Sequence, residues 1–240
     1  MSEGESFLRR FHAEHPGITS RVFERGGSYD RLAARVPAGA RVLELACGDG
    51  ALLRRLGPRA LGIDLSAEEV ARGQPGRVVQ GRAQALPFAS STFEVCACHL
   101  AFMLLDDITR VVAELARVLA PGGTFLAVLG GGPVAGGDDA FHRFLALLAR
   151  APRAAPRFGD PRARSEAGWR HLFAGWRVDD FERWELDLSG SFEEVWAFLA
   201  ASYELPRGQV ARLRDELERA TRDLAAGGVV PCRVVTWLAR

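Results

Sequence analysis

The chain contains no lysine, because all 31 residues in the combined count of lysine and arginine are arginine, and it contains no asparagine. Codons for lysine and asparagine are rich in A and T, so a GC-rich genome accounts for both absences. The missing lysine nevertheless excludes mechanisms that use a lysine Schiff base or a lysine general base.

Strong charge imbalance and long apolar runs are also missing. The 240 residues carry a net charge of +1 with no basic tail, which argues against DNA as a partner and, less strongly, against RNA. No apolar run approaches the ~20 residues that span a bilayer, so no membrane partner is expected. The acidic start, Met1 to Ser6, has no secretory apolar segment, which favours a cytoplasmic protein.

Only four cysteines occur, and none of them has the Cys-x-x-Cys spacing of a zinc site. We expect Cys47, Cys96, Cys98 and Cys232 to be reduced, buried small residues. No metal ion is therefore expected.

The stretch from Arg41 to Gly50 is the most informative feature that is present. An apolar run reaches Glu44, and a loop of small residues follows, with Ala46, Gly48 and Gly50. Leucines at helical spacing come next, so the stretch predicts a strand, a tight turn and a helix over about 49–56. In a doubly wound fold this is where a nucleotide-like ligand meets the first strand. A second apolar strand ends in Asp64, whose carboxylate can accept both hydroxyls of a ribose.

Three further motifs identify the nucleoside. A dinucleotide site would show G-x-G-x-x-G. Read from residue 46, its first glycine is replaced by Ala46, and read from Gly48, its third glycine is replaced by Leu53. Gly81 to Phe88, Thr92 to Val95 and Ala120 to Leu126 follow at regular intervals. Together the four motifs resemble class I S-adenosylmethionine-dependent methyltransferases, most closely the methyltransferase type 11 branch, which is similar to ubiquinone and menaquinone biosynthesis enzymes. The resemblance covers roughly residues 38–130.

The resemblance implies an α/β, Rossmann-like fold with helices on both faces of a seven-stranded, mostly parallel sheet whose last strand is antiparallel. The expected strands are 41–46, 60–64, 78–80, 93–98, 124–129, 178–188 and 232–238. One domain, 1–240, would comprise a helical cap (1–37), a cofactor-binding core (38–130) and lid insertions for the acceptor (131–176 and 190–228). The glycine-rich stretch 130–137 is expected to be a flexible hinge.

The resemblance also implies cofactor contacts. Glu44 would orient the glycine turn or the methionine amine, Asp64 would bind the ribose, and Leu65 would pack on adenine. The full expected cofactor set is Tyr29, Glu44, Ala46, Gly48, Gly50, Asp64, Leu65, Arg82, Ala83, Gln84 and His99. One departure stands out, because Arg82 replaces the aspartate that accepts from the adenine amino group, and arginine has donors only. Either Gln84 supplies the acceptor or this contact is lost.

Candidate catalytic bases are His99, at the end of a strand, and His12 and His15, on an N-terminal helix. An unperturbed histidine pKa of about 6.5 suits proton removal at neutral pH. Surface or structural histidines are the alternative for all three. Candidate acceptor contacts are Phe102, Met103, Trp169 and Trp196, although core packing explains aromatic residues equally well.

The sequence therefore predicts methyl transfer from S-adenosylmethionine, which becomes S-adenosylhomocysteine, to an O, N or C atom of a small-molecule acceptor. A role in secondary metabolism is favoured. Asn-Pro-Pro-Tyr and Asp-Pro-Pro-Tyr are absent, which removes the usual signature of DNA base methylation. Two alternatives stay open: a protein that binds S-adenosylmethionine for regulation or cyclisation without methyl transfer, and an NAD-type oxidoreductase. The protein is expected to be a monomer or a homodimer.

Overall fold

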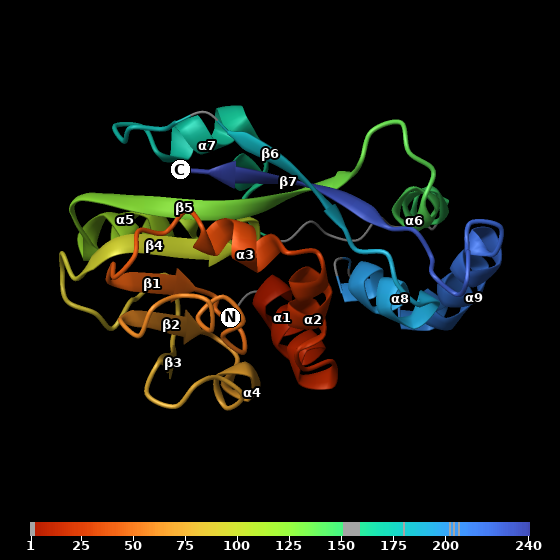
Figure 1. The fold of residues 1–240 in the computed structure, drawn as a ribbon, viewed down its shortest axis with the longest axis horizontal. Helices are drawn as coiled ribbons and strands as arrows, with labels where there is room; N and C mark the ends of the chain where they lie inside the picture. The colour runs from red at the N-terminus through yellow and green to blue at the C-terminus, as the bar shows by residue number, and fades with distance from the viewer. Residues whose placement is uncertain (1–2, 151–158, 180, 202, 204, 206) are drawn as a thin grey trace.

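A seven-stranded sheet runs through the protein in the order β3-β2-β1-β4-β5-β7-β6 (Figure 1). The computed structural model describes residues 3–150, 159–179, 181–201, 203, 205 and 207–240. Its strands are β1 (Val42–Leu45), β2 (Ala60–Asp64), β3 (Val78–Gln80), β4 (Phe93–His99), β5 (Leu119–Pro133), β6 (Glu182–Asp187) and β7 (Arg233–Ala239). The first five strands pair in parallel, and β7 pairs antiparallel with β5 and β6. The expected fold class, with its antiparallel last strand, is confirmed.

Helices lie on both faces of this sheet and beyond its ends. They are α1 (Glu3–Glu14), α2 (Ile18–Arg25), α3 (Ser28–Ala33), α4 (Ala67–Val70), α5 (Ile108–Val118), α6 (Ala140–Leu148), α7 (Glu166–Leu172), α8 (Phe192–Ala201) and α9 (Val210–Thr221). In Figure 1, α6, α8 and α9 gather beyond one end of the sheet, next to α1 and α2. Within the described part of the chain, no helix is both long and apolar enough to cross a bilayer.

Alternation along the strands divides the core into two layers. Val42 belongs to the apolar cluster on the face covered by α2, α3, α6 and α8, whereas Leu43 and Leu45 belong to the cluster on the face covered by α5 and α7. This follows from the two-residue period of a strand. Glu44 therefore shares the face of Val42, which is the face covered by α2 and α8.

The segment after β1 differs from expectation. The residues after β1 form hydrogen-bonded turns over 48–55 rather than a regular helix. The Arg55 guanidinium donates to the carbonyl oxygen of Ala51 at 2.9 Å, and the Arg55 backbone N–H instead donates to Leu52. A side chain has thus taken the acceptor that a helix would use.

The expected hinge at 130–137 begins instead as part of β5. Gly130 pairs with Thr236 and Gly132 with Val235 of β7, with a bulge between them. Glycine tolerates the left-handed backbone of Gly132, where φ is 103°. The strand therefore includes the first part of the expected hinge and ends at Pro133.

At Gly62, β2 packs closely against the turn after β1. A Cβ atom at this position would lie 2.6 Å from Cys47 Sγ and 2.8 Å from Leu53 Cδ1. We expect Gly62→Ala to lower the free energy of unfolding by about 1–3 kcal/mol, as overpacking does. Urea denaturation of Gly57→Ala is the control, because a Cβ at Gly57 meets no atom within 4 Å. Equal stability of the two variants would contradict this account.

Candidate active site

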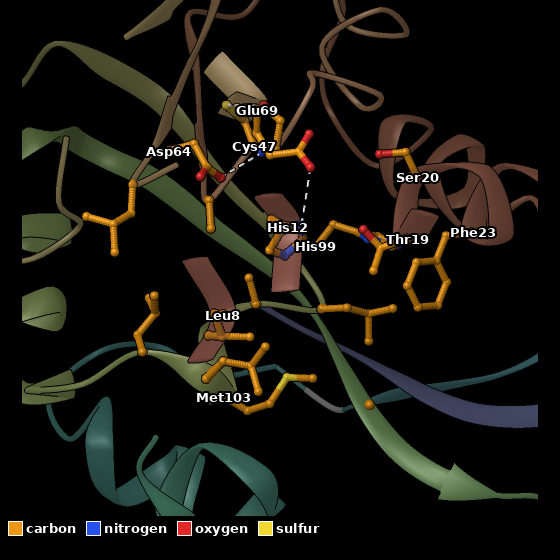
Figure 2. A pocket seen from close by; sticks show the side chains of 18 of the residues that line it. Leu8, His12, Thr19, Ser20, Phe23, Cys47, Asp64, Glu69, His99 and Met103 are labelled. Atoms are coloured by element: carbon orange, nitrogen blue, oxygen red, sulfur yellow. Dashed lines mark hydrogen bonds and ion pairs between the residues drawn. The ribbon is translucent and has the colours of Figure 1, made fainter. Parts of the chain in front are cut away.

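A cavity of about 590 Å³ opens where β1, β2 and β4 end at their carboxyl edge. This is where open α/β sheets bind ligands. Side chains of α1, α2, α6 and α8 complete its wall, together with the loop after β4. Figure 2 shows Asp64, Glu69, His12, His99 and Met103 around this space.

The turn after β1 fixes the most polar part of the wall. Ala46 and Gly48 both adopt a left-handed backbone, with φ of 51° and 53°. The N–H of Gly48 donates to Asp64 Oδ2 at 2.8 Å, and the N–H of Ser66 donates to Asp64 Oδ1 at 2.8 Å. Each carboxylate oxygen has two lone pairs, so both keep capacity for another donor. Burial raises the pKa of Asp64, although these two backbone bonds oppose the shift.

Glu44 lies beside this turn, 2% exposed, on the wall of the cavity. Its Oε2 atom is buried and has no hydrogen-bond partner among the residues that the structure describes. Burial, followed by the charges of Asp64 and Asp49, raises the pKa of Glu44 well above its ordinary value. A buried carboxyl oxygen without a partner is costly, so the site suits a ligand that brings a cation or a hydrogen-bond donor.

His99 ends β4 on the same wall. Its Nε2 atom lies 2.6 Å from the hydroxyl oxygen of Ser28, and its ring packs against the ring of Tyr29 with centroids 4.2 Å apart. Burial lowers the pKa of His99 to about 3, so the ring is neutral at physiological pH. A group with so low a pKa accepts protons poorly at pH 7, which does not suit the expected general base.

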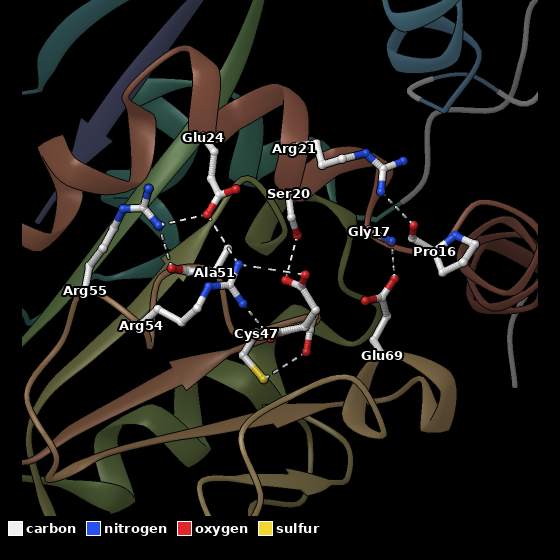
Figure 3. Close-up of polar contacts among 12 residues, drawn as sticks. Pro16, Gly17, Ser20, Arg21, Glu24, Cys47, Ala51, Arg54, Arg55 and Glu69 are labelled. Carbon is white, nitrogen blue, oxygen red and sulfur yellow. Dashed lines mark hydrogen bonds and ion pairs between the residues drawn. The ribbon is translucent and has the colours of Figure 1, made fainter.

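His12 connects the N-terminal helix to the site. Its Nδ1 atom lies 3.2 Å from Glu69 Oε1 at the end of the short helix α4, and the N–H of Gly17 donates to the same oxygen at 3.3 Å (Figures 2 and 3). Burial acts to raise the pKa of Glu69, but the contacts with His12 and Gly17 outweigh it and lower the value. These contacts hold α1 across the cavity.

Figure 3 shows a second set of contacts that holds α2 against the turn. The Ser20 hydroxyl donates to Asp49 Oδ1 at 2.7 Å. Arg54 and Arg55 both donate to Glu24 Oε1, at 3.3 and 3.1 Å. The turn is thereby attached to a helix that the sequence analysis did not predict.

Five expected site residues lie away from the cavity: His15, Gly50, Phe102, Trp169 and Trp196. Phe102 is fully buried and packs against Trp169, with ring centroids 5.0 Å apart. Trp169 also stacks on Phe125, and Trp196 packs edge-on against Phe144. These three aromatic residues belong to the core, as the alternative interpretation held. His15 is exposed beyond the end of α1, and Gly50 is buried within the turn.

Comparison with known proteins finds a family that matches the central segment. The family described as a methyltransferase domain matches residues 43–127. This segment is therefore similar to methyltransferase domains. The matched residues include β1, β2 and β4, which form the floor of the cavity.

Curated relatives agree with this assignment. Malonyl-[acyl-carrier protein] O-methyltransferase of Pectobacterium atrosepticum is 33% identical over 126 residues, which cover 48% of this chain and 50% of the relative. The C-methyltransferase UbiE of Desulfotalea psychrophila is 39% identical over 98 residues, which cover 36% and 40%. The chain spans about half the length, or less, of the relatives with the strongest matches.

A solved structure extends the likeness of fold beyond the methyltransferase domain. The YcgJ protein of Bacillus subtilis superposes with a TM-score of 0.54 at 20% identity, covering 91% of this chain and 98% of that one. At this identity the likeness supports the fold alone.

The remaining twelve expected residues line the cavity in or near the methyltransferase domain: His12, Tyr29, Glu44, Ala46, Gly48, Asp64, Leu65, Arg82, Ala83, Gln84, His99 and Met103. Their roles stay predictions. Sequence reasoning missed Ser20 and Phe23 of α2, Phe141 of α6 and Phe198 of α8, which also line it. The glycines on either side of residues 18–25 were the available signal for α2, whereas nothing local marked the inward face of α6 or α8.

Burial of neutral His99 predicts a pH-dependent stability. Between the folded pKa of about 3 and the unfolded value of about 6.5, the unfolded chain binds more protons at this site, so stability falls as the pH falls. From pH 7 to pH 5 the contribution is about 2 kcal/mol. We expect the free energy of unfolding to fall by about that much more in the wild type than in His99→Phe, which cannot be protonated. Parallel pH profiles in urea titrations would contradict a buried neutral His99.

Proposed function

We propose that the protein binds S-adenosylmethionine in this cavity and transfers its methyl group to a small acceptor. The observation that carries the proposal is the pair of carboxyl groups of buried Glu44 and half-buried Asp64, at the ends of adjacent strands with the left-handed turn between them. One has an oxygen without a partner and the other has spare acceptor capacity. This arrangement, with acceptors that lack donors, fits a ligand with an amino group and a ribose diol.

The residues that line the cavity would contact different parts of such a ligand, according to their chemistry. Asp64 would accept from the ribose hydroxyls, Glu44 would face the amino group, and the backbone at Ala46 and Gly48 would lie along the methionine portion. Leu65 and Ala83 would border adenine, and the hydroxyl and ring of Tyr29 would border the methionine end. When bound, the cofactor supplies a methyl carbon activated by a sulfonium. The chain itself aligns the two reactants and excludes water.

The proposed nature of the methyl acceptor rests on the apolar side chains that line the cavity. Phe23, Met103, Phe141, Leu145 and Phe198 line the cavity on the side of α2, α6 and α8. We infer a small, largely apolar acceptor, such as a secondary metabolite. The neutral His99 favours an acceptor atom that needs positioning rather than a strong base. The relatives named above differ in the atom that their names specify, so the O, N or C atom is left open.

The two alternative functions, NAD-type oxidoreduction and binding of S-adenosylmethionine without methyl transfer, differ in how well they fit the site. Leu53 stands where a motif read from Gly48 would have its third glycine, and it is fully buried in the core, so its side chain fills the space that a glycine leaves for close packing of helix and strand. This disfavours an NAD-type oxidoreductase. Only an assay of methyl transfer distinguishes a methyltransferase from a protein that binds S-adenosylmethionine without transferring its methyl group.

Calorimetric titration tests the cofactor directly. We expect S-adenosylmethionine and S-adenosylhomocysteine to bind with micromolar affinity and NAD not to bind. Asp64→Ala should weaken binding by more than about tenfold, because it removes charge-assisted hydrogen bonds to the ribose. Glu185→Ala, which changes an exposed carboxylate on β6, is the matched control. Undiminished affinity in the Asp64 variant would refute the site, and binding without S-adenosylhomocysteine formation across an acceptor screen would leave a binding protein.

The raised pKa of Glu44 predicts that binding of the ligand releases protons. This pKa is raised well above the ordinary value in the ligand-free protein, and a bound ammonium group would lower it again by favouring the carboxylate. Binding should therefore release protons, and the release should be largest at pH values between the pKa of the free protein and that of the complex. Titrations with S-adenosylhomocysteine in phosphate and Tris buffers measure it from the difference in heat. Glu44→Gln should abolish the release and Glu185→Gln should not; equal release in all three proteins would contradict the assignment.

A further inference from the structure

The expected acceptor for the adenine amino group is missing, and this inference rests on the proposed cofactor. Arg82 stands where the resemblance calls for an aspartate, and its guanidinium has donors only. The Arg82 side chain is exposed at the rim, because the tight turn 82–85 points Gln84 inward instead. A cofactor bound here would need another acceptor for its exocyclic amine, either the side-chain oxygen of Gln84 or a carboxylate close by.

Asp106 supplies a carboxyl group in the right place. It lines the cavity together with Arg82, Ala83 and Gln84. Its Oδ2 atom is buried and has no hydrogen-bond partner within the described parts of the chain. Gln84 Nε2 donates to the backbone carbonyl of Asp106 at 2.7 Å, and Arg110 Nε donates to the backbone carbonyl of Gln84 at 2.8 Å. Asp106 is therefore fixed directly beside the segment that borders adenine.

The loop that carries Asp106 is held in a strained conformation. Leu100 at its start and Asp107 at its end both have a left-handed backbone, with φ of 53° and 44°. Residues other than glycine adopt this conformation only where the surroundings enforce it, and such residues gather at functional sites. The two residues with a left-handed backbone thus lie on either side of the cavity-lining residues of the loop after β4.

We propose that Asp106 accepts a hydrogen bond from the exocyclic amino group of adenine, in place of the acceptor that Arg82 cannot provide. The bond would give the buried carboxyl oxygen the donor that it lacks in the protein alone. A hypoxanthine base carries an oxygen at this position, which would face the carboxylate without a donor. Asp106 therefore makes the site selective for adenine over hypoxanthine.

Calorimetric titration with S-adenosylhomocysteine and S-inosylhomocysteine tests this selectivity. The wild type should prefer the adenine compound by about tenfold or more, as expected for one hydrogen bond to a charged group. Asp106→Asn keeps the shape of the side chain but can also turn a donor toward an oxygen, so its preference should shrink by about fivefold or more. Asp107→Asn is the matched control: it changes the exposed neighbouring carboxylate, tolerates the left-handed backbone and should keep the wild-type preference.

The outcomes separate this inference from the proposed function. If the wild type binds neither nucleoside, the proposed cofactor fails. If both bind and Asp106→Asn retains the full preference, or loses affinity for both compounds equally, the cofactor stands and the role of Asp106 is overturned.

Discussion

Burial of carboxyl groups is the constraint on which this site depends. Glu44 and Asp64 lie at the ends of neighbouring parallel strands, and burial is the main cause that raises both pKa values. The charge of Asp64 adds to the shift at Glu44, whereas a backbone hydrogen bond from Leu53 and the Arg54 guanidinium oppose it. A cationic ligand would favour the Glu44 carboxylate, so ligand binding and proton balance are linked at this site.

The backbone holds these carboxyl groups in place. The N–H of Cys47 donates to the carbonyl oxygen of Ile63 at 3.1 Å, and Gly62 leaves just enough room for the Cys47 side chain. The left-handed backbone at Ala46 then turns the chain so that the N–H of Gly48 reaches Asp64. Alanine in place of glycine there carries a conformational cost, which the hydrogen bonds on both sides offset. The acidic site and the close packing beneath it are thus one structural unit.

How much of this could be read from the sequence depends on the range of the interactions. Glu44, Gly48 and Asp64 were predictable because strand, turn and strand end are local patterns, and their position at the cavity follows from a parallel sheet. Trp169 and Phe141 were not, since both are aromatic residues on short helices and only long-range packing decides that one joins the core and the other the cavity. The turns at 48–55 eluded prediction because one guanidinium competes for one carbonyl oxygen.

The same packing bears on how a methyl group could move here. His99 is held neutral by burial, Ser28 fixes one of its ring nitrogens, and the aromatic rings of Tyr29 and Phe23 pack against it. Such a residue contributes shape and a fixed hydrogen-bonding pattern rather than proton transfer. His12 and Glu69 hold α1 against the wall of the cavity. If the proposed methyl transfer takes place here, it would depend on alignment of the reactants rather than on a strong base, and it would favour acceptors whose attacking atom already carries a free electron pair at neutral pH.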